Sequence, residues 1–431
     1  NVPAKQMSLY PDRPGHFVDW LCERYVHVPG YVPGYVPGDV PADMPGRRLD
    51  AEEIPDAFVP RIYYGNYVAE SFETALAERN TDQICEVVQT GACDIEREST
   101  GDWRVSCEDG AKRRARYVVM ATGNFAPADP PLPDPGVIMQ SASYIGNPWG
   151  EKSQERMSAL NGDERILLIG TGLTMADMVM SLHDQGHRGQ LTAISRHGLR
   201  SRTHKAHAPL PDTAPFEPAN MPDGLLPRFH RFKQLLRDAA RDGYDWRAVI
   251  TGMRASTPAL WAGFSGVEKQ RFLRHLRSYW DVHRHMVAPA VGACLDELQA
   301  RGQLAVHAGK IRQLRTESAA IAVDWRSRGR EALQQLHVDY IINCTGPDYN
   351  FHRTQAPIWR SLVDKGYAAP DMAGIGVAAC DDGALIRADG VPVNGLYTIG
   401  TPRIGSQWET TAVPELRNQA QALAMLLAGK V

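Results

Sequence analysis

The feature that most restricts the fold is an apolar run that passes through two glycines into a helical pattern. Residues 165–169 are typical of a buried strand, Gly170 and Gly172 of a tight turn, and residues 173–182 of a helix. In such a unit the second glycine lets the backbone approach a pyrophosphate, whose charge then lies at the helix N-terminus. Met175 stands where a third glycine commonly allows close helix–strand packing, so we expect a local adjustment there. We predict a dinucleotide-binding turn, with an ordinary strand–helix turn as the alternative.

The residues that follow the next strand indicate which nicotinamide cofactor would bind. About 20 residues after the turn, a carboxylate would bind the ribose 2′-hydroxyl of NAD. This sequence instead has Ser195, Arg196 and His197 there, with Arg200 and Arg202 close by. A guanidinium beside a hydroxyl suits a 2′-phosphate, so we predict NADPH. A solvated basic turn is the alternative.

Two longer stretches, 84–123 and 304–346, repeat one pattern. Each has short alternating strands joined by turns, and then one apolar strand that ends in Thr-Gly, at Thr122-Gly123 and at Thr345-Gly346. A strand that is apolar throughout is typical of the interior of a parallel sheet, and ligands bind at the carboxyl ends of such strands. In the first stretch the expected strands cover 84–87, 92–95, 103–107 and 117–121.

Two segments depart from the strand pattern. Residues 205–300 contain many prolines and amphipathic helical stretches, such as 225–240 and 267–287, and we interpret them as a helical insertion that shapes a substrate pocket. Residues 28–41 repeat a Val-Pro-Gly unit, which is typical of a surface loop. That loop is either a lid or partner loop, or a loop lengthened by repeat slippage.

The C-terminal part combines a short apolar strand with a helix. The strand covers 395–399 and is followed by Gly400, and we expect the helix to begin near Thr411. Pro414 falls in its first turn, where proline is favoured. The free N–H groups of such a helix start would suit an electron-rich flavin edge.

Composition argues against several other classes of protein. The chain has 431 residues, a net charge of −3 and 23% charged residues, which is typical of a globular protein of two or three domains and gives no basic surface for nucleic acid. We find neither an apolar run long enough for a membrane helix nor a signal segment. Seven scattered cysteines without a C-x-x-C pair indicate a reducing compartment, the cytoplasm, and argue against a zinc ribbon or a dithiol centre. The histidine pairs are poorly spaced for metal binding, so we expect no metal.

Together these features resemble the two-dinucleotide-binding-domain flavoproteins. Within them the chain is most similar to the bacterial FAD-NAD(P)-binding family, which is related to flavin N-hydroxylases and Baeyer–Villiger-type monooxygenases. The matching motifs are residues 1–4 with Met7 and Ser8, 58–61 with Tyr64 and Gly65, 121–123, 170–177, 279–285, 344–346 and 408–417. One motif departs from the family pattern, because no glycine turn for the FAD pyrophosphate precedes Asn1. Either the chain is incomplete or FAD binding has been lost.

The resemblance implies where the cofactors lie. The N-terminal residues would lie near the isoalloxazine ring, the two Thr-Gly pairs would mark the crossings between domains, and the C-terminal motif would hold the flavin ring and ribitol. No catalytic side chain stands out. The cofactor-binding residues expected from the motifs and the resemblance are Asn1, Val2, Met7, Ser8, Arg61, Thr122, Gly123, Gly170, Gly172, Thr174, Ser195, Arg196, Thr345, Gly346, Gly400, Trp408, Glu409 and Thr411.

We therefore predict an α/β fold with two interleaved Rossmann-like domains, small β-meanders and a helical insertion. Residues 1–140 would begin the FAD domain, residues 141–345 would form the NAD(P)H domain, and residues 346–431 would complete the FAD domain. The predicted function is an FAD-dependent oxidoreductase that takes hydride from NADPH, of the flavin monooxygenase type, with a small-molecule substrate and O₂. The alternatives are a flavin reductase without oxygenation, and a non-catalytic nucleotide-binding or redox-sensing module.

Overall fold

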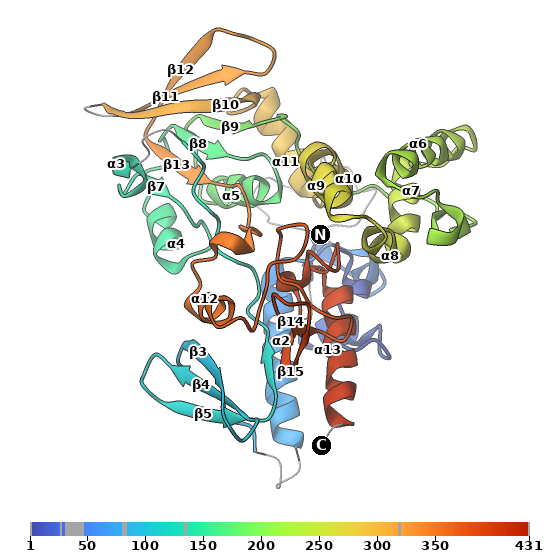
Figure 1. Cartoon of the computed structure of the whole chain (residues 1–431). Coiled ribbons are helices and arrows are strands. Elements are labelled where there is room, and N and C mark those ends of the chain that lie inside the picture. Colours follow the sequence, from blue (N-terminus) through green and yellow to red (C-terminus); the bar gives the residue numbers. More distant parts are fainter. Residues whose placement is uncertain are drawn as a thin grey trace.

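The largest part of the fold is a seven-stranded mixed sheet with the strand order β12-β11-β10-β9-β8-β13-β7 (Figure 1). The computed structural model describes residues 2–25, 28–30, 47–79, 84–132, 136–317 and 320–429. The strands of this sheet are β7 (Tyr144–Ile145), β8 (Ile166–Ile169), β9 (Leu191–Ser195), β10 (Leu304–Glu317), β11 (Ala320–Ser327), β12 (Leu333–Val338) and β13 (Tyr340–Asn343).

The parallel part of this sheet is buried on both faces, as its apolar strands predict. Strands β7, β13, β8, β9 and the start of β10 are parallel. Helices α5 (Leu173–Asp184) and α11 (Pro289–Ala300) cover one face, and side chains of the antiparallel meander β10–β12 cover the other. Met175 is fully buried against the sheet, so its side chain fills the core where a third glycine would leave space.

A second, smaller sheet has the order β14-β15-β6 and is built from distant parts of the chain. Strand β6 (Val118–Met120) pairs in parallel with β15 (Pro392–Thr398), and β14 (Ala384–Ile386) is antiparallel to β15. Helix α13 (Val413–Ala428) packs on this sheet through Leu423. Helix α2 (Arg61–Glu78) runs alongside and packs against α1 (His16–Arg24) in a separate aromatic core (Figure 1).

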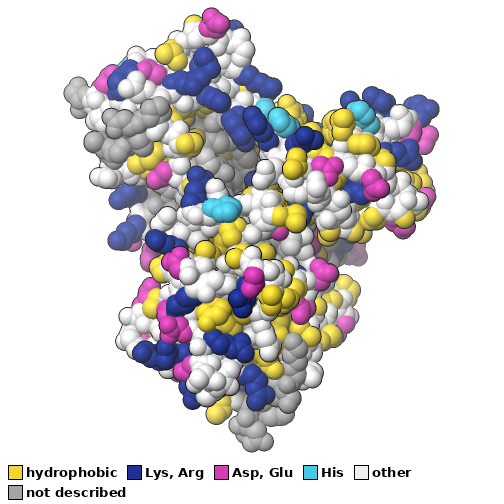
Figure 2. Space-filling model, viewed as in Figure 1, with side chains coloured by type: hydrophobic (Ala, Val, Ile, Leu, Met, Phe, Trp, Pro, Cys, Tyr) yellow, Lys and Arg dark blue, Asp and Glu magenta, His cyan; other side chains and the backbone are white. Residues whose placement is uncertain are grey.

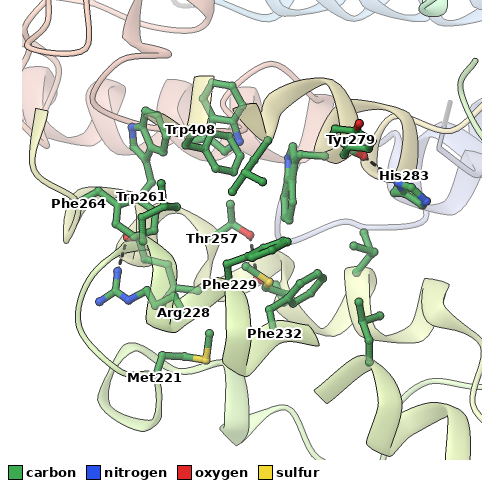
Figure 3. Close-up of a pocket in the computed structure, with 18 of the residues that line it drawn as sticks. Met221, Arg228, Phe229, Phe232, Thr257, Trp261, Phe264, Tyr279, His283 and Trp408 are labelled. Carbon is green, nitrogen blue, oxygen red and sulfur yellow. Dashed lines mark hydrogen bonds between the residues drawn. The ribbon is translucent and has the colours of Figure 1, made fainter. Parts of the chain in front are cut away.

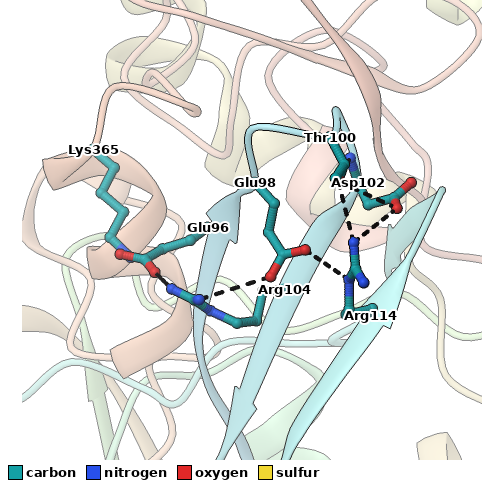
Figure 4. A network of polar contacts seen from close by, with 7 residues as sticks. All are labelled: Glu96, Glu98, Thr100, Asp102, Arg104, Arg114 and Lys365. Carbon is teal, nitrogen blue, oxygen red and sulfur yellow. Dashed lines mark hydrogen bonds and ion pairs between the residues drawn. The ribbon is translucent and has the colours of Figure 1, made fainter.

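The first predicted meander forms a three-stranded antiparallel sheet of β3 (Ala92–Arg97), β4 (Trp103–Cys107) and β5 (Lys112–Ala115). It packs on α12 (Pro357–Asp364). Figure 4 shows the ion-pair network on its surface, in which Arg104 contacts Glu96 and Glu98, and Arg114 contacts Glu98 and Asp102. Water and salt screen such exposed pairs, so they stabilise the sheet little, and the buried Trp103 and Ile95 hold this sheet in place. The expected strand at 84–87 is wrong: this segment has no regular structure, and Ile84 is almost fully exposed.

The predicted helical insertion contains six α-helices, and the first five of them project from the β9–β10 connection (Figure 1). The single helix expected over 267–287 is two helices, because the backbone turns at Leu276 between them. The end of the predicted insertion is α11, which belongs to the large sheet. The five projecting helices are α6 (Leu225–Arg241), α7 (Trp246–Met253), α8 (Thr257–Ala262), α9 (Gly266–His275) and α10 (Arg277–Arg284).

The predicted α/β class, with small meanders and a helical insertion, is therefore confirmed. The first Val-Pro-Gly unit forms β1 (Val28–Gly30), which pairs with β2 (Arg47–Leu49) in a short hairpin. The rest of the repeat lies outside the described residues, as does Asn1. Among the described helices, none combines the length and the apolar character that a bilayer crossing requires.

Candidate functional site

A cavity of about 1000 Å³ lies at the carboxyl ends of β8, β9 and β13, where ligands bind in parallel sheets. Its walls come from the glycine turn after β8, the end of β9, the segment after β13, helix α10 and the loop before α13. Most of the predicted cofactor-binding residues meet here although they are far apart in the sequence. Those that line the cavity are Gly170, Gly172, Thr174, Ser195, Arg196, Thr345, Gly346, Trp408, Glu409 and Thr411.

The two glycines of the turn have different structural roles. Gly170 has φ +119°, and a Cβ there would lie 2.8 Å from the carbonyl carbon of Cys344, so the crossing of the chain after β13 requires glycine. Gly172 has an ordinary φ of −86°, and a Cβ there would meet no atom within 4 Å. The space in front of Gly172 belongs to the cavity, and the N-terminus of α5 has no side-chain cap. Free N–H groups and open space at a helix N-terminus suit a phosphate.

The residues after β13 form the opposite wall of the turn. Asn343 is fully buried, and its Oδ1 accepts hydrogen bonds from the Thr345 hydroxyl (2.8 Å) and the Thr345 N–H (3.2 Å). Its Nδ2 donates to the carbonyl of Ala128 at 3.0 Å. A Cβ on Gly346, which has φ +80°, would also meet no atom within 4 Å. This network fixes a backbone crossing whose open side faces the cavity.

Three cations line one side of the cavity and form no ion pair with a carboxylate among the described residues. Arg196 follows β9, and Lys310 and Arg312 follow the parallel part of the neighbouring strand β10. Figure 2 shows Lys and Arg side chains gathered over this region of the sheet. By contrast, Arg200 is ion-paired with Asp296, so its charge is already balanced. The unbalanced cations suit a bound anion.

The serine before Arg196 holds this turn together. Its Oγ lies 2.8 Å from the Thr171 Oγ1 and accepts a hydrogen bond from the N–H of Gly198 at 3.0 Å. The Thr171 hydroxyl in turn donates to the carbonyl of Leu199 at 2.5 Å. Ser195 therefore ties the end of β9 to the glycine turn and positions Arg196 at the cavity.

A buried carboxylate stands at the other end of the cavity. Glu409 is only 8% exposed and has φ +72°, a backbone conformation that residues other than glycine rarely adopt. Its oxygens contact Arg284 Nε (3.0 Å) and His285 Nε2 (3.5 Å), and accept a hydrogen bond from Trp280 Nε1 (2.6 Å). Burial alone would raise the pKa of Glu409, but the contacts with His285, Arg284 and Trp280 outweigh it and hold this pKa at about 2. The carboxylate stays charged and fixes α10 against the loop before α13.

Side chains of α10 and of the segment after β13 complete this end. Arg277 donates to Asp281 at 3.2 Å, and its guanidinium lies 5.3 Å from the ring centroid of Tyr349 and 5.8 Å from that of Trp408. Burial raises the pKa of Asp281, and the nearby charge of Glu409 adds to this, whereas Arg277 and His285 oppose it. The cavity thus has cations at the sheet end and a mixed aromatic and charged wall at the α10 end.

The other predicted site residues lie outside the cavity. Arg61 Nη2 donates to both carboxylate oxygens of Asp177, at 2.9 and 3.0 Å. Thr122 Oγ1 accepts a hydrogen bond from Trp359 Nε1 at 3.0 Å, and Gly123 follows it. The Gly400 N–H donates to Gln419 Oε1 at 2.9 Å. Thr122, Gly123 and Gly400 follow strands of the small sheet, whereas Arg61 contacts α5. The proposed contact of these residues with FAD stays a prediction.

The N-terminal segment is tied to the C-terminal helix. Ser8 is fully buried, its hydroxyl donates to the carbonyl of Arg13 at 2.7 Å, and its own carbonyl accepts from Arg417 at 2.9 Å. Met7 packs in the aromatic core of α1 and α2, and Val2 is half-buried. Arg254 of the insertion pairs with Glu415 in the first turn of α13. The helix that we expected near Thr411 begins at Val413, with Pro414 in its first turn as predicted.

Sequence reasoning missed several residues of the cavity wall. Lys310 and Arg312 could have been found, since two cations follow a strand beside β9, at the same edge of the sheet as Arg196. Asp281 and His285 lie in a motif used for the family resemblance, but nothing in their spacing showed that they face the glycine turn. Among the described residues, no group of three His, Cys, Asp or Glu side chains is placed to hold a metal ion.

The cavity residues fit a phosphorylated dinucleotide. The open space before Gly172 and Gly346, the uncapped start of α5 and the three unpaired cations provide a place for a pyrophosphate and for a further phosphate. At the other end, the indole N–H of Trp408 is buried and has no acceptor among the described residues. A ring system with hydrogen-bond acceptors at that end would satisfy it.

Comparisons with known proteins agree with this arrangement. Residues 1–125 match a family model described as FAD-NAD(P)-binding. A search of curated protein sequences finds no match. Among solved structures, the chain resembles the ornithine hydroxylase of Pseudomonas aeruginosa, with 16% identity, a TM-score of 0.55, and coverage of 85% of this chain and 74% of that one.

Two other structures show the same likeness. The ornithine N-hydroxylase of Kutzneria sp. 744, solved with reduced FAD, NADP⁺ and L-ornithine, has 15% identity and a TM-score of 0.57, with 88% and 79% of the two chains covered. The L-lysine 6-monooxygenase of Pseudomonas syringae has 14% identity and a TM-score of 0.55, with 86% and 82% covered. At these identities the likeness concerns the fold. Residues 1–125 therefore match the FAD-NAD(P)-binding family, and the chain as a whole has the predicted fold of the flavoproteins with two dinucleotide-binding domains.

Proposed function

We propose that this protein is an FAD-dependent oxidoreductase of the monooxygenase type, which takes hydride from NADPH and transfers one atom of O₂ to a small molecule. The observation that carries this proposal is the single cavity in which the glycine turn, the unpaired cations and the Trp408–Thr411 loop meet. In this proposal residues 141–345 carry NADPH, and the segments before and after them carry FAD. The solved structures of similar fold bear titles of flavin-dependent hydroxylases, which supports the same class.

The chain's own residues would bind and orient NADPH. The N–H groups at the start of α5 and the backbone at Gly172 would hold the pyrophosphate, and Arg196, Lys310 and Arg312 would hold the 2′-phosphate. The Glu409 cluster would keep α10 and Trp408 in place at the far end of the cavity. There the nicotinamide would meet the flavin, whose chemistry when bound is to accept the hydride and pass its electrons to O₂.

The proposed reaction balances in atoms, electrons and charge, and it assigns no catalytic acid to the cavity. NADPH supplies two electrons as hydride, one oxygen atom enters a bond of the substrate, and the other leaves as water after taking up protons. The products are oxygenated substrate, NADP⁺ and water from substrate, O₂, NADPH and one proton. We also place the protein in the cytoplasm, a proposal supported by the free thiols of all seven cysteines, which lie in the described part of the chain.

The test is to supply FAD-loaded protein with NADPH and candidate substrates and to measure NADPH oxidation, O₂ uptake and product mass together. The proposal predicts equal amounts of NADPH and O₂ consumed and a product heavier by one ¹⁸O atom when ¹⁸O₂ is used. NADPH oxidation that yields only hydrogen peroxide with every substrate would support the flavin reductase alternative. Absence of NADPH oxidation by the loaded protein would support a non-catalytic module.

A further inference from the structure

A second cavity lies within the helical insertion and is almost wholly apolar (Figure 3). Its volume is about 300 Å³, at the small end of the range of about 300–1,000 Å³ that is usual for ligand pockets. Helices α6 to α10 and Trp408 surround it. The aromatic side chains that dominate its lining are Phe229, Phe232, Trp246, Trp261, Phe272 and Trp280.

Three of the polar side chains in this lining, Arg228, Thr257 and His283, are bonded to the protein itself. The Arg228 guanidinium donates to the carbonyls of Pro222 (2.9 Å) and Leu260 (2.7 Å) and lies 5.0 Å from the ring of Phe264. The Thr257 hydroxyl donates to the carbonyl of Met253 at 3.0 Å, and His283 Nδ1 lies 2.7 Å from the carbonyl of Tyr279. Dashed lines in Figure 3 mark the bonds of Arg228, Thr257 and His283 to backbone carbonyls of other residues of the lining. The pocket therefore offers few free partners to a polar ligand.

Among the residues that the structure describes, no carboxylate lines this pocket. An ammonium group placed inside it would lose its hydration and gain no counter-charge, which is strongly unfavourable. Arg228, a cation in the lining, already donates its hydrogen bonds to backbone carbonyls, and its positive charge would repel an ammonium group. The lining thus selects against the amino-acid side chains on which the similar solved enzymes, by their titles, act.

Only single side chains separate this pocket from the cofactor cavity. Trp408 lines both, stacked on Trp261 with ring centroids 4.8 Å apart and with Phe272 edge-on at 5.6 Å. Trp280 lines the apolar pocket and donates its N–H to Glu409, which lines the cofactor cavity. A molecule in the apolar pocket would lie next to the end of the cofactor cavity where we place the hydride transfer.

We propose that this apolar pocket is the substrate site and that the substrate is a neutral, largely apolar molecule. The assignment of a substrate rests on the proposed function, whereas the assignment of a neutral apolar ligand rests on the lining alone. The aromatic walls supply contact area and exclude water, and Trp408 and Trp280 position the ligand at the boundary with the cofactor cavity.

The binding test needs no cofactor. The neutral fluorophore N-phenyl-1-naphthylamine brightens in apolar surroundings, and we expect saturable binding of one molecule per chain. Neutral ring compounds such as 2-naphthol should displace it, and L-ornithine and L-lysine should not. Displacement by the charged amino acids at comparable concentrations, or the absence of saturable binding, would overturn the proposal.

Variants of α6 separate a pocket effect from a general loss of folding. Phe232→Asp should weaken fluorophore binding at least about tenfold, because an unpaired carboxylate would enter the apolar lining. Leu226→Asp is the matched control on the same helix, since Leu226 is 62% exposed and outside the lining, and it should bind normally. Phe229→Ala enlarges the pocket and should shift preference toward larger ring compounds, which partial unfolding would not do. Equal binding by the Phe232 variant and its control would contradict the assignment.

The outcomes also distinguish this proposal from the function on which it rests. Fluorophore binding with the expected selectivity, but no oxygenated product from any neutral ligand, overturns the proposed monooxygenase function. If NADPH reduces the flavin normally but Phe232→Asp does not change fluorophore binding, only the assignment of the apolar pocket as the ligand site is overturned.

Discussion

The same substitution should have different effects at the two glycines of the turn after β8: valine at 170 should destabilise the fold, and valine at 172 should remove nucleotide binding. Gly170→Val would force a side chain into φ +119° and place a Cβ 2.8 Å from the Cys344 carbonyl carbon. A strained backbone costs about 1–3 kcal/mol and overpacking about 1–3 kcal/mol more. We therefore expect a loss of about 2–6 kcal/mol, a large share of the about 5–15 kcal/mol that holds a typical domain.

Gly172→Val should leave the fold intact and remove nucleotide binding. Gly172 has φ −86° and ψ −157°, an extended conformation that valine favours, and nothing lies within 4 Å of its Cβ position. The unfolding free energy should thus stay within about 1 kcal/mol of the wild type. The added side chain would occupy the space assigned to the pyrophosphate, so NADPH affinity should fall at least about tenfold, or about 1.4 kcal/mol.

The assay combines thermal unfolding with titration of NADPH fluorescence on each variant. The reasoning is refuted if the Gly172 variant binds NADPH normally, since the turn would then be structural and the nucleotide would lie elsewhere. It is equally refuted if the Gly170 variant melts like the wild type.

Three further predictions concern charged residues. Arg196→Ala should remove most of the preference for NADPH over NADH, so the ratio of the two affinities should fall roughly 10- to 100-fold. We expect the low end of this range because Arg196 is exposed to solvent. A variant that keeps the preference in parallel titrations would exclude this role. For Glu409→Gln, the difference between an ordinary pKa of 4.5 and a pKa of about 2 corresponds to about 3 kcal/mol. Because that pKa is lowered, the variant should be less stable than the wild type above pH 4.5, and the difference in unfolding free energy between them should disappear as the pH falls toward 2. A difference that does not depend on pH in denaturant unfolding would contradict the stabilising role of the Glu409 charge. Arg61→Ala removes the ion pair with Asp177, whose arginine is solvent-exposed, and should cost at most about 1 kcal/mol of unfolding free energy; a larger loss in denaturant unfolding would contradict the assignment of a weak surface pair.

The sequence predicted those parts of the fold and site that local chemistry determines. The apolar run of β8 predicted a buried strand of a sheet, and the glycines after it predicted the tight turn at the edge of the cavity. Both predictions follow from local chemistry, because a wholly apolar strand must be buried and glycine is the residue that adopts positive φ most readily. The same reasoning placed Arg196 at the cavity. Strand propensity alone failed at Ile84, because no described strand pairs with this segment and the Ile84 side chain is exposed to solvent.

Long-range contacts account for what the sequence did not show. The Glu409 cluster joins a loop before α13 to α10, more than 120 positions away in the chain, and no spacing rule links them. Arg61 belongs to a motif used for the resemblance, and no spacing rule showed that its guanidinium contacts Asp177 of α5. The apolar pocket depends on how five helices pack, and the break at Leu276 that shapes it is not marked by glycine or proline.

The most direct test of the central claim is anaerobic mixing of the FAD-loaded protein with NADPH while the visible absorbance of the flavin is recorded. We predict that the flavin band bleaches with NADPH, more slowly with NADH, and not with NADPH in the Gly172→Val variant, which dithionite still reduces. A wild-type flavin that dithionite reduces but NADPH does not would contradict the claim that this cavity delivers hydride from NADPH to FAD.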